Sequence, residues 1–304
     1  MRKKIDVHTH LIGNICGIGS EGELRPIGNG MAQYASGKVI RLIPEGYGEY
    51  QLTPNTLIDL MDKHNVEYTV CLQGNYVGFQ NLYTYEGMIA YPNRIIGAAT
   101  YDPFFKNKDK IINHLFDELK FKVIKMEVSN GSGLMANHPT VKLNGDVMDT
   151  VYKMADSKKL IFFIDIGRPG NNCYQVDELK EAILKYPDTT FIICHLTAPQ
   201  HEQMTILEEN MNKLNMDNVY FDIASLPNNT KQPYPFIEAQ QYIRKAIDIV
   251  GANKILWGSD FPAAMNYCSY EQAYKYIEDS KLLSEEEKDN ILYHNANALF
   301  ARLK

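Results

Sequence analysis

Two histidines one residue apart, His8 and His10, end a short apolar segment near the N-terminus. In a β-strand, side chains at positions i and i+2 point to the same side, and their Cα atoms lie about 6.6 Å apart. Both imidazoles can therefore reach one ion, whereas a helix would direct them about 200° apart. The spacing predicts half of a metal site at the C-terminal end of a first strand. The alternative is one exposed histidine and one that is hydrogen-bonded in the core.

The elements that must position these histidines alternate between strand-like and helix-like segments. After the first strand, further strands are predicted at residues 66–72, 94–100, 122–128, 160–164, 190–194, 219–223 and 254–257. Several are continuous apolar runs, which is typical of strands buried on both faces of a parallel sheet. Eight such βα units favour an α/β fold, a (β/α)8 TIM barrel with a long first βα loop and an extra C-terminal helix over 284–303. We expect one barrel domain over 1–304.

The long first loop, residues 11–53, is rich in glycine and has no clear periodicity. A loop of this length is usually functional, and here it is expected to cover the mouth of a site. Residues 17–22 match the form of the dinucleotide-binding fingerprint, but that motif must open a helix, and Pro26 and Gly28 follow instead. An open doubly wound sheet would need a glycine loop directly after the first strand, where this chain has histidines, so the barrel is favoured.

Composition excludes several classes of protein. The chain has 304 residues and a formal net charge of -6, without the basic patches of a nucleic-acid-binding protein. Its N-terminus lacks the apolar segment of a signal peptide, and no apolar run approaches the ~18 residues of a membrane span. The five cysteines include no Cys-x-x-Cys pair. We expect a cytoplasmic homo-oligomer that acts on a small molecule and binds neither nucleic acid nor membrane.

Residues of the types that bind metals end most of the predicted strands. They are His8, His10, Glu127, Asp165, His195, Asp222 and Asp260. In a (β/α)8 barrel the C-terminal ends of the strands form one mouth, so these side chains would converge there. Any one of them alone could be a helix cap or a turn residue. Several carboxylates in one mouth, however, need a counter-charge, which a divalent cation supplies.

Several segments also carry a family resemblance. They are Asp-Val-His-Thr-His at 6–10, the segment 91–103, the strand ending in His195, Trp-Gly-Ser-Asp-Phe-Pro at 257–262 and the tail 290–300. In content and order they resemble the amidohydrolase-related family, the branch of the amidohydrolase superfamily that includes aminocarboxymuconate semialdehyde decarboxylase. The resemblance covers nearly the whole chain. It implies a metal-dependent barrel that is a hydrolase or a nonoxidative decarboxylase.

The resemblance implies a role for individual residues. It makes His8 and His10 metal ligands, and it makes Asp260 both a ligand and the catalytic acid and base. It matches His195 to a histidine that contacts the reactive water or the substrate carbonyl. At the end of strand five the family usually has a histidine, where this chain has Asp165. An aspartate can still bind zinc, and it shifts the preference towards harder ions such as manganese.

A second carboxylate, Glu127, is a candidate for bridging a second ion. The alternative is an ordinary ion pair with a lysine, and Lys125 is close in sequence. The simplest site therefore contains one divalent ion, zinc first and manganese second, bound by His8, His10, Asp165 and Asp260.

The function expected from these residues is hydrolysis of a small carboxylate, cyclic ester or amide by water that the ion activates, with Asp260 and His195 as catalytic residues. The first alternative is nonoxidative decarboxylation of a carboxylated ring or muconate-like compound. The second is a catalytically inactive barrel that serves as a binding protein. The candidate substrate-binding residues, which offer cationic, aromatic or imidazole groups, are Arg168, Arg41, His138 and Tyr76.

Overall fold

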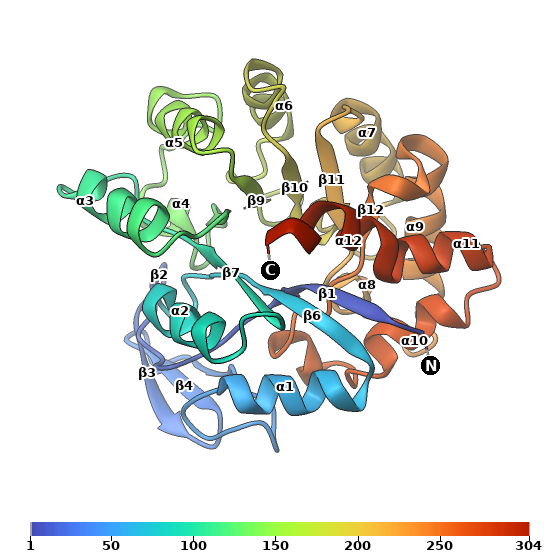
Figure 1. Ribbon diagram of the computed structural model, residues 1–304, viewed down its shortest axis with the longest axis horizontal. Coiled ribbons are helices and arrows are strands. Elements are labelled where there is room, and N and C mark those ends of the chain that lie inside the picture. The colour runs from blue at the N-terminus through green and yellow to red at the C-terminus, as the bar shows by residue number, and fades with distance from the viewer. Residues whose placement is uncertain (1, 304) are drawn as a thin grey trace.

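Eight parallel strands form one sheet in the computed structural model, which describes residues 2–303 (Figure 1). In chain order they are β1 (Lys4–Thr9), β6 (Val66–Cys71), β7 (Ile95–Ala99), β8 (Val123–Glu127), β9 (Ile161–Asp165), β10 (Phe191–Ile193), β11 (Val219–Asp222) and β12 (Ile255–Leu256). The backbone N–H of Val7 donates to the Trp257 carbonyl at 3.1 Å, and that of Asp260 donates to the His8 carbonyl at 2.8 Å. The first and last strands therefore meet, and the predicted (β/α)8 barrel is confirmed.

Helices surround the sheet (Figure 1). They are α1 (Pro54–Lys63), α2 (Asn81–Ala90), α3 (Lys108–Ile112), α4 (Leu134–Asn137), α5 (Asp146–Ser157), α6 (Val176–Lys185), α7 (Met204–Leu214), α8 (Leu226–Thr230), α9 (Ile237–Val250), α10 (Gln272–Glu278), α11 (Glu285–Asp289) and α12 (Asn295–Phe300). Side-chain caps explain where two of them begin: the Thr53 hydroxyl accepts the Thr56 N–H at 3.2 Å before α1, and Ser284 and Glu287 form a capping box on α11. None of the described helices is long and apolar enough to cross a membrane.

The predicted loop 11–53 is not structureless, and that part of the expectation was wrong. It contains a four-stranded antiparallel sheet of β2 (Ile18–Gly19), β3 (Gly22–Gly28), β4 (Met31–Tyr34) and β5 (Val39–Arg41). Asn29 and Gly30, between β3 and β4, both have positive φ values, 52° and 69°. A type I′ hairpin turn requires this conformation at both central residues, and Asn-Gly is its preferred sequence. The sequence Asn29-Gly30 is therefore sufficient to predict the turn, although the short strands around it show no clear alternation of apolar and polar residues.

Side chains inside the barrel form their own apolar cluster, separate from the layer between strands and helices. Val7, Val123 and Phe163 belong to the inner cluster, and α12 closes it from the N-terminal end of the strands. Phe300 of α12 is fully buried and stacks on Phe163, with ring centroids 6.1 Å apart. The predicted C-terminal helix is thus the plug of the barrel, and the opposite end of the strands stays open.

We predict that Phe300→Ala lowers the free energy of unfolding by about 3–5 kcal/mol, because it removes a fully buried aromatic ring and leaves a cavity. Denaturant titration followed by circular dichroism measures this change. Leu82→Ala is the matched control, since the Leu82 side chain is exposed, and it should change stability by about 0.5 kcal/mol or less. A loss below about 1 kcal/mol for Phe300→Ala would show that α12 does not close the core.

Candidate active site and metal centre

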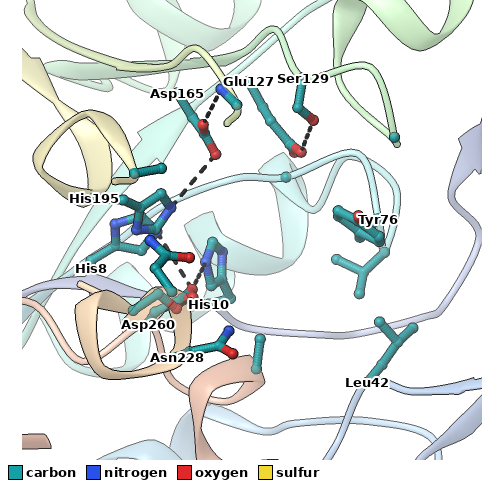
Figure 2. A pocket seen from close by; sticks show the side chains of 18 of the residues that line it. His8, His10, Leu42, Tyr76, Glu127, Ser129, Asp165, His195, Asn228 and Asp260 are labelled. Carbon is teal, nitrogen blue, oxygen red and sulfur yellow. Dashed lines mark hydrogen bonds and ion pairs between the residues drawn. The ribbon is translucent and has the colours of Figure 1, made fainter. Parts of the chain in front are cut away.

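A cavity of about 480 Å³ opens at the C-terminal ends of the strands (Figure 2). Side chains from several strands line it together with residues of the inserted sheet and of the loops after β9, β11 and β12. His8, His10, Asp165, His195 and Asp260 all face it, as the barrel prediction requires. The cavity is therefore the place where the strand-end residues named from the sequence meet.

His8, His10 and Asp260 form a compact group of ligand-type atoms that all lie within 4.8 Å of one another. Oδ1 of Asp260 lies 3.2 Å from Nε2 of His10 and 3.7 Å from Nε2 of His8. His8 lies on β1 and His10 directly after its last residue, and the centroids of the two imidazole rings are 5.1 Å apart. The i, i+2 spacing thus brings both rings to the carboxylate at the far end of the chain.

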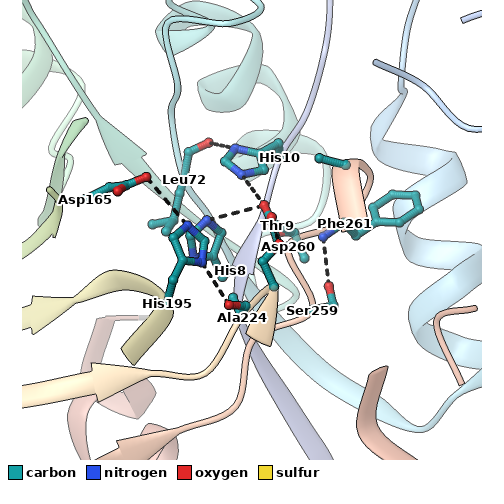
Figure 3. Close-up of polar contacts among 12 residues, drawn as sticks. His8, Thr9, His10, Leu72, Asp165, His195, Ala224, Ser259, Asp260 and Phe261 are labelled. Carbon is teal, nitrogen blue, oxygen red and sulfur yellow. Dashed lines mark hydrogen bonds and ion pairs between the residues drawn. The ribbon is translucent and has the colours of Figure 1, made fainter. Parts of the chain in front are cut away.

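The partners of the two rings fix their tautomers, and Figure 3 shows the Leu72 carbonyl beside the ring of His10. Nδ1 of His8 lies 3.1 Å from Oδ2 of Asp222, and Nδ1 of His10 lies 3.1 Å from the Leu72 carbonyl. Carboxylate and carbonyl oxygens accept hydrogen bonds, so both Nδ1 atoms carry the proton. Burial also lowers the pKa of His8 to about 4, which keeps this ring neutral at pH 7. The Nε2 lone pairs are then directed towards the cavity.

Asp260 completes a set of donors that fits a divalent cation. Burial alone would raise the pKa of this carboxyl, but its contacts with His10, His8 and His195 outweigh burial and hold the pKa well below its usual range. An ionised carboxylate and two nitrogen lone pairs directed at one point repel one another unless a cation lies between them. Two histidine nitrogens and one carboxylate oxygen are also a known ligand set of catalytic zinc.

A second group of ligand-type atoms, His8, Cys194 and Asp222, does not fit a metal equally well. Burial raises the pKa of the Cys194 thiol well above its ordinary value, so the sulfur is protonated. The Asp222 carboxylate is already used: it binds His8 and accepts the backbone N–H groups of His195 at 2.9 Å and Ala224 at 3.0 Å. Asp222 therefore orients the His8 ring from behind.

Asp165 lies beside His195 and does not join the group of His8, His10 and Asp260. Its Oδ2 is 3.6 Å from Nε2 of His195, while Nδ1 of His195 donates to the Ala224 carbonyl at 2.9 Å. Burial lowers the pKa of His195, but the hydrogen bond and charge of Asp165 outweigh burial and raise the pKa to about 10. His195 is thus a cation whose ring lies 4.8 Å from that of His8.

Backbone conformation at the mouth is unusual at three site residues. His195, Ser225 and Asp260 have φ values of 59°, 55° and 57°. Left-handed conformations cost non-glycine residues about 1–2 kcal/mol each, and they gather at functional sites where the surrounding structure holds them. Here they turn the side chains inward: the Ser225 hydroxyl donates to Oδ2 of Asp260, and Asp260 faces His10. Sequence reasoning missed Ser225, since a serine three residues after a strand end gives no distinctive signal.

Glu127 lies on the other side of the cavity from Asp260 (Figure 2). Its carboxylate accepts hydrogen bonds from the Ser129 hydroxyl at 2.8 Å and from the Asn75 backbone N–H at 2.9 Å. It therefore belongs to a different hydrogen-bonding group from the candidate ligands. No ion pair joins it to Lys125 among residues 2–303, so the lysine pairing considered from the sequence is not formed.

The four candidate substrate-binding residues divide into two sets. Arg41, Arg168 and Tyr76 line the cavity. His138 is not among the lining residues: its Nε2 lies 2.9 Å from Oδ2 of Asp102, and its ring stacks on Phe104 with centroids 4.0 Å apart. Arg41 reaches the cavity from β5, so the inserted sheet forms one of its walls, as expected of the segment 11–53.

The fold and the cavity define a (β/α)8 barrel with a candidate metal centre at the mouth. The chain belongs to the amidohydrolase family: the family model described as Amidohydrolase matches residues 5–302. This match confirms the family expected from the sequence motifs. It also confirms the expectation of an enzyme of amidohydrolase type. No curated protein matches the sequence.

Solved structures with the same fold include hydrolases and decarboxylases. A probable 2-pyrone-4,6-dicarboxylic acid hydrolase from Acinetobacter baumannii, with citric acid bound, is 17% identical with a TM-score of 0.74, covering 99% of this chain and 100% of that one. An amidohydrolase from Burkholderia multivorans with bound zinc is 12% identical with a TM-score of 0.72, covering 99% of each chain. The 5-carboxyvanillate decarboxylase from Sphingomonas paucimobilis is 12% identical with a TM-score of 0.56, covering 80% and 82%.

The pairing of His195 with Asp165 predicts a pH dependence of the metal-free protein. Because folding raises the pKa of His195 from an ordinary 6.5 to about 10, the pair stabilises the fold fully below about pH 6.5. This contribution is lost as the pH rises towards about 10. The unfolding free energy of the wild type should therefore fall more steeply between about pH 7 and 10 than that of Asp165→Asn.

Nitrogen NMR of the imidazole provides an independent measurement. His195 should remain protonated at about pH 8 in the wild type and lose its proton at lower pH in Asp165→Asn. Titration of His195 near 6.5 in the metal-free wild type would contradict the assigned ion pair.

Proposed function

We propose that this chain is a metal-dependent hydrolase of a small carboxylate, cyclic ester or amide. The observation that carries the proposal is the convergence of one nitrogen from each of two imidazole rings and the Asp260 carboxylate on one point, with the cationic His195 beside them. We assign His8, His10 and Asp260 as the residues that would hold one divalent ion. Asp165, which lies against His195, would act mainly by keeping that ring protonated.

A divalent ion in such a site supplies Lewis acidity towards the oxygen atoms of water and substrate. Zinc is the first choice because the donor set contains two histidines and one carboxylate, and because one of the similar structures carries bound zinc. Manganese is the alternative if Asp165 joins the ligands, since an additional carboxylate favours a harder ion.

The chain's own residues provide the proton transfers that hydrolysis needs. Asp260, ionised and held by Ser225, can accept the proton of the attacking water and return it to the leaving alcohol or amine. The Nε2–H group of His195 can donate to the carbonyl oxygen, where negative charge develops as the water attacks. Asp165 and the Ala224 carbonyl fix the orientation of that donor.

The other walls of the cavity suit a small anionic or aromatic substrate. Arg41 and Arg168 offer planar guanidinium groups that can bind a carboxylate, and Tyr76 offers a ring. Tyr76 is 43% exposed as a residue, but desolvation of its hydroxyl raises the pKa of that group to about 12, so it remains a neutral hydrogen-bonding group. The citric acid bound to the Acinetobacter protein supports a carboxylate-bearing ligand.

Nonoxidative decarboxylation is the second candidate. Two of the similar structures are a 5-carboxyvanillate decarboxylase and a 2,6-dihydroxybenzoate decarboxylase. In that reaction Asp260 would carry a proton to the ring carbon as carbon dioxide leaves. A screen of lactones, amides and carboxylated rings, with release of carbon dioxide measured alongside hydrolysis, distinguishes the two reactions.

We predict that the purified protein binds about one zinc or manganese ion per chain and that His10→Ala binds well under one, because one of three ligands is lost. Inductively coupled plasma mass spectrometry after dialysis measures the content. His138→Ala is the matched control, since His138 lies outside the cavity against Asp102, and it should retain the ion. A metal-free wild type after supply of either ion would contradict the proposal and favour a binding protein without catalysis.

With a substrate found in the screen, Asp260→Asn should reduce kcat/KM by about 100-fold or more, because the amide cannot accept the proton of water. Circular dichroism should show an intact fold in the variant. His138→Ala should again behave like the wild type. Full activity of Asp260→Asn would rule out this carboxylate as the acid and base.

A further inference from the structure

We propose that Lys125 forms a carboxylate-binding subsite at the floor of the cavity, which rests on the proposed function in taking this cavity as the substrate site. The subsite would hold a carboxylate of the substrate deeper in the barrel than the side chains of His195 and Asp260. Lys125 has no role in the metal group or in the proton transfers described above.

The position of Lys125 follows from the alternation of side chains along β8. Val123 belongs to the cluster inside the barrel, so Lys125 and Glu127, two and four residues further on, point to the same side. Phe163 on β9 is the register partner of Lys125, and Asp165 is that of Glu127. Lys125 therefore lies one layer below the carboxylates at the rim. It is 2% exposed, and it lines the cavity.

The acidic side chains around Lys125 are bound to other groups. Glu127 accepts hydrogen bonds from Ser129 and Asn75, and Asp165 accepts one from the Gly167 backbone N–H at 2.8 Å and faces His195.

Asp260 lies against His10 and accepts a hydrogen bond from the Ser225 hydroxyl. Within residues 2–303, no carboxylate oxygen forms an ion pair with Lys125 at 4.0 Å or less. The ammonium thus has donors to offer to a ligand in the cavity.

An amine buried in this way is costly for the fold. Charged groups lose several kcal/mol of hydration free energy on burial, and they are normally paired directly. An apolar side chain of similar length at position 125 would avoid this loss. A charged residue that is buried without an ion-pair partner, and that does not stabilise its surroundings, is commonly functional. The lysine is therefore better explained by ligand binding than by stability.

A buried amide provides a second unused donor. Asn229 on α8 is 5% exposed and lines the cavity, and its Nδ2 has no hydrogen-bond partner among the described residues. Lys125 and Asn229 come from β8 and from the helix that follows β11, so they approach the cavity from different sides. Asn229 thus adds a second donor without a partner to the lining of the same cavity, which is consistent with an acceptor-rich ligand.

The chemistry of the floor selects the kind of anion. Lys125 carries a single charge, and Glu127 and Asp165 lie above it at the rim. A dianionic phosphate would bring two charges close to these carboxylates, whereas a carboxylate brings one. Lysine binds as a point charge and does not need the paired oxygens that arginine prefers. The subsite therefore fits one carboxylate, while Arg41 and Arg168 remain available at the cavity wall for another group of the substrate.

The experiment compares benzoate with benzamide, which has nearly the same shape but no charge, by calorimetric titration of the full chain. The wild type should bind benzoate more tightly. Lys125→Met should weaken benzoate binding by about tenfold or more and leave benzamide binding unchanged, because only the charged ligand loses its partner. Lys125→Arg, which keeps the charge, should retain most of the preference. Lys122→Met is the control, since Lys122 precedes the same strand and is exposed.

The titrations are made on zinc-loaded and on metal-free protein, so that failure of the metal proposal leaves this test intact. Thermal unfolding should show that Lys125→Met is as stable as the wild type or more stable, because a buried charge is removed. If Lys125→Met does not fold, Lys125→Gln takes its place. An unchanged preference for benzoate in the folded variant, or equal binding of benzoate and benzamide by the wild type, would overturn the subsite.

Discussion

The mouth of this barrel depends on the electrostatic conflict among three side chains. The Nδ1–H groups of His8 and His10 each donate a hydrogen bond to an oxygen behind the site, which leaves two nitrogen lone pairs opposite the Asp260 carboxylate. Such a group is unfavourable by itself and becomes favourable around a cation. The left-handed conformation of Asp260 and its hydrogen bond from Ser225 hold the carboxylate in this position. The strand ends are therefore preorganised for a positive ligand.

Two buried carboxylates behind the mouth connect the site residues to the barrel strands by hydrogen bonds. Asp222 links β11 to His8, and Asp6 accepts the backbone N–H groups of His8 at 3.1 Å and Ser259 at 2.9 Å and the Tyr270 hydroxyl at 2.7 Å. Burial raises the pKa of Asp6 to about 6. These contacts join the first strand to the seventh and to the segment after the eighth, where the barrel closes. The same hydrogen bonds therefore close the sheet and hold the site residues in place.

The sequence was sufficient to predict the repeated strands and the functional residues at their ends. The predicted strand positions agree with the structure to within one or two residues, and His8, His10, His195 and Asp260 meet because a parallel barrel brings all strand ends together. The contact of Asp165 with His195 depends on the orientation of two side chains, which strand order does not determine. Closeness in sequence makes Lys125 a candidate partner of Glu127, as the alternative to a bridging role for that carboxylate. Ser129 and Asn75, which bind Glu127 instead, come from separate loops.

In this barrel the candidate metal ligands and one wall of the cavity come from different parts of the fold. The candidate ligands His8 and His10 lie at the end of β1 and directly after it. The sheet β2–β5 lies between that strand and α1 in the chain, and Ile40 and Arg41 of β5, with Leu42 directly after it, contribute to the cavity wall. Its hairpins have their own hydrogen-bond registers, independent of the barrel strands. Substitutions or changes of length in these hairpins can reshape the wall without moving the ligands. Selection can therefore change which compound is accepted while the reaction chemistry is inherited unchanged.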